Sequence, residues 1–323
     1  MNRIINNLII KSFILSAGII LLSCTGREGS RSESAKKLYK HVVIIGIDGL
    51  TIDGFQITTT PVLSYVIANG AVKYGARSVL PSSTIPNWGA MIHGAGTEAS
   101  GITSNNWQSD GQRMSPVVTN QWGLFPGIFD IIRAQIPKAE QGIMFNWSGF
   151  GFANHFNNLL QRAIINRCGI YPDSPEETAR HACDYIISKK PTFFFVILNH
   201  VDGTGHEHGF MSEEYHQAIA NADRLAGKII ESIITAGMID NTLIMILSDH
   251  GGSGKKHGGE SDDEVSLPYF FYGKGIKKNY KIQQPVYAYD IAATVAFALN
   301  LKVPYAWTGR PVLAAFEGYP EPE

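Results

Sequence analysis

Continuous apolar runs alternate with helix-like segments along most of the chain. The first run covers residues 41–48, and similar runs recur at 142–146, 192–199, 242–248 and 269–272. This pattern is typical of strands in a parallel sheet, because helices cover both faces of such a sheet. Residues 61–69, 176–188 and 213–236 lie between the runs and have helical patterns. The alternation predicts an α/β fold with a mainly parallel central sheet and helices on both faces.

The length of the chain fits one large domain after a short leader. Of its 323 residues, 44% are hydrophobic, and we expect a single α/β domain over residues 39–316 with a tail at 317–323. The range 107–190 is predicted to include a small cap or substrate-selecting insertion, since residues 107–126 are rich in polar and turn-forming residues. The formal net charge is −1, so nothing in the composition favours binding to a nucleic acid polymer.

The N-terminus has the pattern of an export signal. Arg3 and Lys11 precede an apolar run over residues 12–22, which ends at Leu22-Ser23-Cys24. As a helix this run would rise only about 16 Å, too little to cross a bilayer. The sequence before Cys24 resembles a bacterial lipobox, which implies a signal peptide at 1–23 and a lipid on the Cys24 thiol. An ordinary cleaved signal is the alternative.

The polar residues 24–38 predict a flexible tether between this leader and the domain. Together the leader and tether predict an exported protein on the periplasmic or cell-surface side, held to a membrane by its N-terminal lipid. Two further cysteines, Cys168 and Cys183, could pair in an exported protein or remain separate buried thiols. The spacing of the two cysteines does not decide between these states.

Three of the predicted strands end in residues that bind metals. In open α/β sheets, ligands gather beyond the carboxyl ends of the strands. Carboxylate and imidazole groups together suit zinc and related divalent ions. The candidate ligands at or just after the three strand ends are Asp48; then Asp202 and His206; then Asp249, His250 and His257. Three aspartates with one threonine alkoxide would balance the charge of two divalent cations, and neutral histidines would complete the coordination.

Thr84 is the candidate nucleophile. It lies in Ser83-Thr84-Ile85-Pro86, where a proline suited to the first turn of a helix predicts a helix that continues to His93. The N-terminus of a helix favours an anion, because its backbone N–H groups and its dipole point toward the ligand. A threonine hydroxyl becomes a good nucleophile when a metal ion lowers its pKa.

These segments together resemble the alkaline phosphatase superfamily, and most closely its type I phosphodiesterase/nucleotide pyrophosphatase branch. The resemblance covers about residues 41–312. The matching segments are Gly46-Ile47-Asp48-Gly49, Thr84-Ile85-Pro86-Asn87, Gly101-Ile102 with Asn105, Asp202 with His206, Ser248-Asp249-His250-Gly251, and a closing segment from Asp290 to Val312. The resemblance implies an alkaline-phosphatase-like fold.

The resemblance also implies a role for each site residue. Asp48, Thr84, Asp249 and His250 would hold one zinc ion, and Asp202, His206 and His257 would hold the other. Asn105, with the Thr84 backbone N–H, would bind a phosphoryl oxygen, although the adjacent Asn106 is an alternative. The Thr84 alkoxide would form a phospho-threonine intermediate on a small phosphoester such as a nucleotide or a lipid headgroup. The expected activity is hydrolysis of phosphodiesters or pyrophosphates.

One departure from that branch leaves the substrate open. His257 follows Asp249 closely, whereas many members place the last histidine far downstream, and the compact spacing looks more like that of phosphoethanolamine-transferring relatives. A phosphomonoesterase, a phosphoethanolamine-type transferase and a non-catalytic metal or headgroup binder therefore remain alternatives. Several other conspicuous residues are expected to be structural: His93, Trp88, Trp107 and Trp122 in or near the core, His200 and His208 beside the ligands, and Asp290 as a helix N-cap.

Overall fold

The computed structural model describes residues 38–109, 111 and 114–322. The predicted signal peptide, Cys24 and almost all of the predicted tether lie outside this part of the chain. In the described part, no helix combines the length and the apolar character needed to cross a bilayer.

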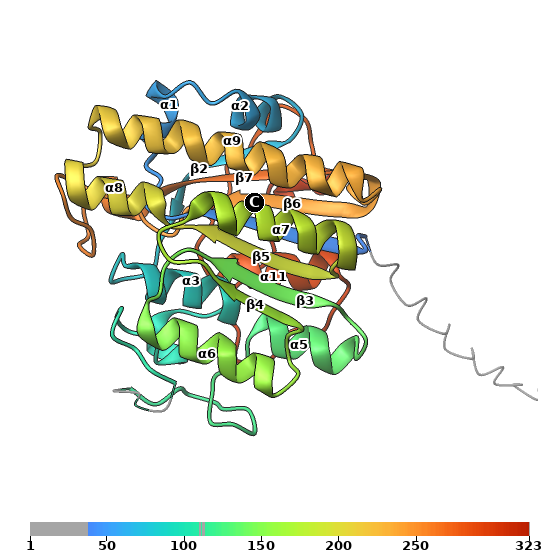
Figure 1. Cartoon of the computed structure of the whole chain (residues 1–323). Helices are drawn as coiled ribbons and strands as arrows, with labels where there is room; N and C mark the ends of the chain where they lie inside the picture. Colours follow the sequence, from blue (N-terminus) through green and yellow to red (C-terminus); the bar gives the residue numbers. More distant parts are fainter. Residues whose placement is uncertain (1–37, 110, 112–113, 323) are drawn as a thin grey trace, which may run out of the picture. The chain divides into compact units, whose positions relative to one another are not determined.

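One eight-stranded sheet runs through the domain (Figure 1), in the order β4-β3-β5-β1-β6-β7-β2-β8. The strands from β4 to β6 are mutually parallel, and β7 alone runs against its two neighbours. The strands are β1 (His41–Ile47), β2 (Ala71–Arg77), β3 (Gln141–Phe145), β4 (Arg167–Ile170), β5 (Phe193–Leu198), β6 (Thr242–Leu247), β7 (Ser266–Tyr272) and β8 (Tyr280–Lys281).

Helices cover both faces of the sheet. Along β5, Phe193, Phe195 and Ile197 pack into the core on one face, and Phe194, Val196 and Leu198 pack into the core on the other. The helices are α1 (Ile52–Ile57), α2 (Pro61–Ala68), α3 (Thr84–His93), α4 (Thr97–Ser100), α5 (Ile128–Gln135), α6 (Phe150–Gln161), α7 (Pro175–Lys189), α8 (His200–His208), α9 (Glu213–Thr235), α10 (Asp262–Val265) and α11 (Asp290–Ala298), with short 3₁₀ turns at Ile239–Asn241 and Leu313–Ala315. The predicted α/β class with helices on both faces is confirmed.

The range 107–190 contains more of the sheet than the sequence indicates. Strands β3 and β4 and helices α6 and α7 all fall within it. The described residues between Ser100 and Ile128 form neither helix nor strand, in agreement with the loop predicted over residues 107–126. Cys168 and Cys183 are free thiols, so the alternative of a disulfide between them is not realised.

The predicted role of Asp290 as an N-cap is wrong. Asp290 is the first residue of α11 and Tyr289 occupies the cap position. The Asp290 carboxylate accepts hydrogen bonds from the backbone N–H groups of Tyr287 (2.8 Å) and Arg310 (2.8 Å). It therefore ties the C-terminal segment to the start of the helix instead of capping that helix.

Candidate metal centre

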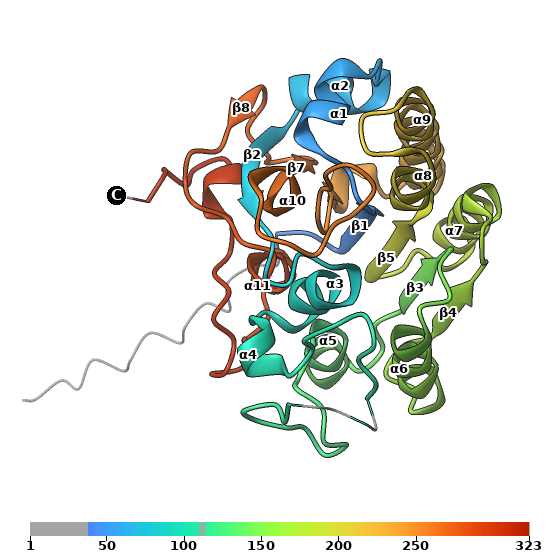
Figure 2. The same cartoon turned by 90° about the vertical axis from the view of Figure 1, so that its left-hand side faces the viewer.

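The candidate ligands converge at the carboxyl edge of the sheet. Strand β1 lies between β5 and β6, so Asp48, which follows β1, is flanked by the segments that follow the other two strands. Helix α8 begins directly after β5 and carries Asp202 and His206. Figure 2 views the molecule from this edge, with α8 and α3 facing the reader.

The first ligand group consists of Asp48, Asp249 and His250, and all three side chains are buried. The His250 Nε2 atom lies 3.3 Å from Asp48 Oδ1 and 3.4 Å from Asp249 Oδ2. Neither of these carboxylate oxygens has a hydrogen-bond partner among the described residues. Buried carboxylates that lack hydrogen-bond partners are costly, and a cation is the natural partner for them.

The electrostatics of this group indicate the same need for positive charge. Burial alone would lower the pKa of His250, but the Asp249, Asp48 and Asp202 carboxylates raise it to about 10. Burial and the neighbouring Asp48 carboxylate raise the pKa of Asp249 well above its usual value. The protein alone therefore neutralises the group by holding protons, and a divalent ion would replace those protons.

The second ligand group consists of Asp202, His206 and His257. Asp202 Oδ2 lies 3.4 Å from His206 Nε2, and Asp202 Oδ1 lies 3.6 Å from His257 Nε2. Asp202 and His206 face each other because they are one helical turn apart on α8. Burial, with the Asp48 charge nearby, raises the pKa of Asp202 to about 6. This group is more open, since the His206 side chain is 46% exposed.

Backbone carbonyls orient all three imidazoles. The Nδ1 atoms of His206, His250 and His257 lie 3.0, 2.8 and 3.0 Å from the carbonyl oxygens of Lys255, Gly251 and Ser82. A carbonyl partner fixes Nδ1 as the protonated nitrogen, which leaves the Nε2 lone pair of each ring directed at the carboxylates. The residues present thus fit a pair of divalent cations. They supply carboxylate and imidazole donors, the backbone carbonyls orient the Nε2 atoms toward the site, and carboxylate oxygens without hydrogen-bond partners are available to a cation.

Thr84 lies beside the first group. It is the first residue of α3, is buried, and its Oγ1 lies 3.1 Å from His250 Nε2. Trp88 holds α3 against β1 at Gly46, where an added Cβ would come within 2.6 Å of the indole ring. The nucleophile candidate and the strand that leads to Asp48 are therefore fixed relative to each other by a contact in the core.

Asn105, and not Asn106, is turned toward the start of α3. The Asn105 Oδ1 atom accepts a hydrogen bond from the Ile85 backbone N–H (2.9 Å), and Asn105 lines the same pocket as Thr84. This bond uses the amide oxygen and leaves the amide N–H₂ as the group available to an anion in the pocket. Asn106 is exposed.

Asn199 and Asn146 are functional candidates that the sequence reasoning missed. Asn199 donates a short hydrogen bond from Nδ2 to Asp48 Oδ2, and its backbone N–H donates to Asn146 Oδ1 at 2.7 Å. Each asparagine directly follows a strand, which is the same signal that singled out Asp48. The pair orients Asp48 from the side opposite His250.

The pocket over both ligand groups has a volume of about 400 Å³. Trp147 and Asp173, which follow β3 and β4, form part of its wall together with Asn105 and Asn146. The range 107–190 thus contributes to this pocket, and Trp147 is a lining residue that the sequence reasoning did not select. Among the described residues, the lining includes no lysine or arginine.

The residues expected to be structural lie in or near the core. Trp88, Trp107 and His93 are buried, and Trp122 is partly buried below the Arg162 guanidinium. Burial lowers the pKa of His93 to about 4, so its ring is neutral at pH 7. His200 lines the pocket, while His208 is exposed beside Glu207.

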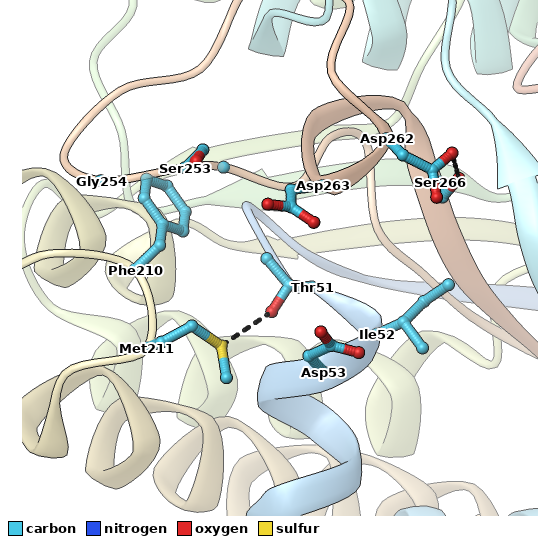
Figure 3. A pocket seen from close by; sticks show the side chains of 11 residues that line it. Thr51, Ile52, Asp53, Phe210, Met211, Ser253, Gly254, Asp262, Asp263 and Ser266 are labelled. Carbon is cyan, nitrogen blue, oxygen red and sulfur yellow. Dashed lines mark hydrogen bonds between the residues drawn. The ribbon is translucent and has the colours of Figure 1, made fainter.

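A second cavity of about 310 Å³ is lined by residues that follow Asp48 and Asp249 in the sequence, Thr51 and Ser253 among them (Figure 3). Thr51, Phe210 and Met211 line one part of it, and the acidic side chains of Asp53 and Asp263 line another. Within the described residues, its carboxylates do not form a group with metal-ligand spacing. The candidate metal centre is therefore the first pocket.

Comparison with known proteins identifies the family. Residues 42–263 match the family model of type I phosphodiesterase / nucleotide pyrophosphatase. The bis(5'-adenosyl)-triphosphatase ENPP4 of Pongo abelii is 23% identical over 246 residues, which cover 72% of this chain and 52% of that protein. The catalytic subunit of GPI ethanolamine phosphate transferase 3 of Mus musculus is 28% identical over 122 residues, or 36% of this chain and 11% of that protein.

Solved structures show the same fold. The structure of human ectonucleotide pyrophosphatase / phosphodiesterase 5 matches with a TM-score of 0.69 at 16% identity. The match covers 86% of this chain and 100% of the human chain. The lipoteichoic acid synthase LtaP of Listeria monocytogenes has a TM-score of 0.62. The chain spans about half the length of the curated relatives it matches. Because the family model covers more than half of the chain, the chain belongs to the type I phosphodiesterase / nucleotide pyrophosphatase family, and its fold is alkaline-phosphatase-like.

Proposed function

We propose that the protein is a metal-dependent phosphoester hydrolase that acts on phosphodiesters or pyrophosphates, with Thr84 as its nucleophile. The observation that carries this proposal is the 3.1 Å approach of Thr84 Oγ1 to His250 Nε2, beside buried carboxylate oxygens that lack hydrogen-bond partners. A hydroxyl at the first residue of a helix, next to a cation site, is placed to attack an anionic phosphoryl group.

Asp48, Thr84, Asp249 and His250 would hold one divalent ion, and Asp202, His206 and His257 would hold the other. Zinc is the best match to this set of carboxylate and imidazole donors. When bound, such ions lower the pKa of a hydroxyl and stabilise the charge of the attacking and leaving oxygens.

The chain's own residues supply the covalent step. Thr84 Oγ1 forms a bond to phosphorus as the bond to the leaving oxygen breaks, and that oxygen departs with the electron pair. Water then attacks the phospho-threonine, restores the Thr84 hydroxyl and releases the phosphorylated product. The Asn105 amide and the Thr84 backbone N–H would hold a non-bridging oxygen, because the N–H of the first helical residue has no acceptor within its helix.

The charge of the pocket lining favours a diester or pyrophosphate over a monoester. No lysine or arginine lines the described pocket, so a second negative charge on the transferred phosphate has no side-chain partner besides the metals. A relative supports the nucleophile and a nucleotide ligand, since murine ENPP5 is described as inactive when a threonine is replaced by alanine, and as a complex with AMP.

A comparison of two chromogenic substrates tests the proposal. Zinc-loaded protein should hydrolyse bis-p-nitrophenyl phosphate faster than p-nitrophenyl phosphate. A preference for the monoester by orders of magnitude would assign the protein to the phosphomonoesterases instead. A panel of nucleotide diesters, dinucleotides and phosphocholine lipids would then identify the leaving group.

Phosphoryl transfer to an alcohol is a second candidate. The compact spacing from Asp249 to His257 favours it, and so does the match to the catalytic subunit of an ethanolamine phosphate transferase. Adding an alcohol such as ethanolamine or glycerol to the reaction should then divert product from the free phosphoester to a new diester. Unchanged product ratios would leave hydrolysis as the reaction.

We also propose that the protein is exported and carries a lipid on Cys24, since the sequence before that residue has the features of a lipoprotein signal. Mass spectrometry of the mature N-terminus tests this directly. An unmodified start downstream of Cys24 would contradict it.

A further inference from the structure

The two edges of the sheet differ in charge, because the amino edge is predominantly basic whereas the carboxyl edge carries side chains of both signs, Lys255 and Lys256 among them. The carboxyl edge holds the metal ligands and, around them, the exposed acidic residues Asp53, Glu207, Asp262 and Asp263. The amino edge carries exposed lysines. We name as the basic edge the set Lys40, Lys138, Lys190, Lys274, Lys278 and Lys302.

The topology brings these lysines to one edge. Lys40, Lys138 and Lys190 each come one to three residues before β1, β3 and β5, and these parallel strands start in register at one side of the sheet. Strand β7 runs in the opposite direction, so Lys274 and Lys278 follow its end at this same side. Three hydrogen bonds hold neighbouring segments together at this edge. The Tyr39 hydroxyl donates to the Lys274 carbonyl (2.8 Å). At the end of α5, the Gln135 side-chain amide donates to the Lys302 carbonyl (2.8 Å), and the Lys302 backbone N–H donates to the Gln135 side-chain oxygen (2.9 Å).

Five of the six lysines are available to a partner. In the described part of the chain, Lys138, Lys190, Lys274, Lys278 and Lys302 take part in none of the ion pairs. Three acidic residues, Glu140, Asp240 and Glu317, lie at the same edge against six lysines, and Asp240 and Glu317 line one cavity with Lys274 and Lys278. Positive charge therefore exceeds negative charge across this side.

Helix dipoles do not explain the pattern. A lysine at a helix C-terminus stabilises the helix, and Lys190, the C-cap of α7, fits that explanation. The other five lysines lie in loops. Leu38 and Val303, each 48% exposed, add apolar side chains beside Lys40 and Lys302.

We propose that the basic edge is a docking surface for an anionic phospholipid bilayer. Cationic side chains beside exposed apolar ones match the headgroup region of such a membrane. The chain enters β1 at this edge, on the side of the molecule away from α8 (Figure 1). Cys24 precedes Leu38 by 14 residues, and the tether that the sequence predicts there would span roughly 20 Å if it behaves as a random coil.

A docked basic edge gives the pocket a fixed orientation. The pocket opens at the opposite edge of the sheet, so its mouth would face the aqueous phase and not the membrane surface that holds the protein. The pocket would then receive soluble substrates or the headgroups of an apposed layer. This orientation goes beyond the proposed chemistry and does not depend on it.

Vesicle partitioning of the full chain tests the surface separately from the N-terminal lipid. Binding is measured to vesicles of phosphatidylcholine alone and of phosphatidylcholine with phosphatidylglycerol. The N-terminal lipid contributes to binding of both vesicle types, but residues 24–38 carry four basic and two acidic side chains and also favour the anionic vesicles. The change in the ratio between the native chain and a variant at the basic edge therefore reports that edge. We expect the anionic vesicles to bind about tenfold tighter, and the double variant Lys274→Glu/Lys278→Glu to lose most of that difference.

The matched control is Lys255→Glu/Lys256→Glu, which makes the same charge change at the carboxyl edge and should keep the preference. Equal partitioning of the native chain into both vesicle types would overturn the proposal. An equal loss in the control variant would also overturn it, because net charge would then be the cause. Binding of soluble dextran sulfate as tight as that of anionic vesicles would reassign the surface to a polyanionic polymer.

Discussion

The two ligand groups of the candidate metal centre use the same side-chain types in different surroundings. Asp48, Asp249 and His250 have side-chain exposures of 0–2%. In the second group the exposures are 14% for Asp202, 46% for His206 and 7% for His257. The first group is therefore part of the core, whereas the second forms the floor of an open pocket.

The two groups therefore meet different physical requirements. The buried group must be neutralised for the core to be stable, because isolated charges in a low-dielectric interior are costly. The open group can exchange water and product without disturbing the core. We therefore expect an ion at the buried group to act as a structural element as well as a catalytic one, and an ion at the open group to exchange faster.

The largest effect is expected for Thr84→Ala, because Thr84 is the proposed nucleophile and lies beside the buried group. We expect turnover to fall by about four orders of magnitude, because Thr84 supplies the hydroxyl that lies beside His250 Nε2, whereas the Ser248 hydroxyl bonds to the His250 backbone carbonyl. Metal content, measured by inductively coupled plasma mass spectrometry, should remain at two ions per chain. Thr84→Ser is the matched control and should keep part of the activity. Unchanged turnover in the alanine variant would favour a non-catalytic metal or headgroup binder.

The second prediction compares one histidine from each group. His250→Ala removes the partner of two buried carboxylates and should lower the free energy of unfolding by about 3–5 kcal/mol. His206→Ala, at a half-exposed position, should lower it by about 1 kcal/mol or less. Urea unfolding of both variants with and without a chelator measures the difference. Equal losses would show that burial does not distinguish the groups.

The third prediction addresses the asparagine behind the buried group. Asn199→Leu removes the hydrogen bond to Asp48 Oδ2 at similar side-chain volume. We expect zinc affinity at the buried group to fall by about 10–100-fold, with the open group unchanged. Competition with a fluorescent chelator resolves the two sites. Asn146→Ala, one step further from the carboxylate, should have a weaker effect in the same direction.

The fourth prediction is a reversal of the pH dependence of stability when metal is removed. In the metal-free chain, the pKa of His250 is raised to about 10, so its contribution is complete below the unfolded value of about 6.5 and is lost as pH rises through 10. Asp202, with a pKa raised to about 6, acts in the same direction at lower pH. Metal-free protein should therefore be less stable at pH 9 than at pH 7 by about 2 kcal/mol.

Metal-loaded protein should behave oppositely. Protons compete with the ions for the histidine ligands, so metal content should fall as pH drops below about 6.5, first at the open group. Thermal unfolding and metal analysis along one pH series measure both trends. Full retention of zinc at pH 4 would contradict the assignment of the histidines as ligands.

The parts of the fold that position the site could be predicted from the sequence. Strands β1, β5 and β6 are apolar at nearly every position because both of their faces are buried, and the residues after them identify the ligand segments. The metal and catalytic roles of these residues stay predictions, although the structure brings the six carboxylate and histidine ligands together in two groups at one edge of the sheet. Asn199 could have been found by the same rule, since it directly follows β5.

Other parts could not be predicted, for physical reasons. Strand β2 contains Lys73 and Gly75, which interrupt its apolar pattern, and Gly75 has a φ of +73° beside a shift in register. The antiparallel direction of β7 could not be predicted from its apolar run, because such a run reports burial of the strand and not its direction. The bond between Asp290 and the Arg310 backbone N–H spans twenty residues, so the local sequence suggested only a cap.

The contact between Trp88 and Gly46 has a consequence for how such a protein can diversify. The separation between Thr84, the proposed nucleophile, and the strand that leads to Asp48 is set inside the core, by an indole ring that fills the space of a missing side chain. The loops after β3 and β4, which supply Trp147 and Asp173, make no part of that contact. Insertions and substitutions in those loops can therefore change which molecule enters the pocket while the reacting atoms keep their spacing.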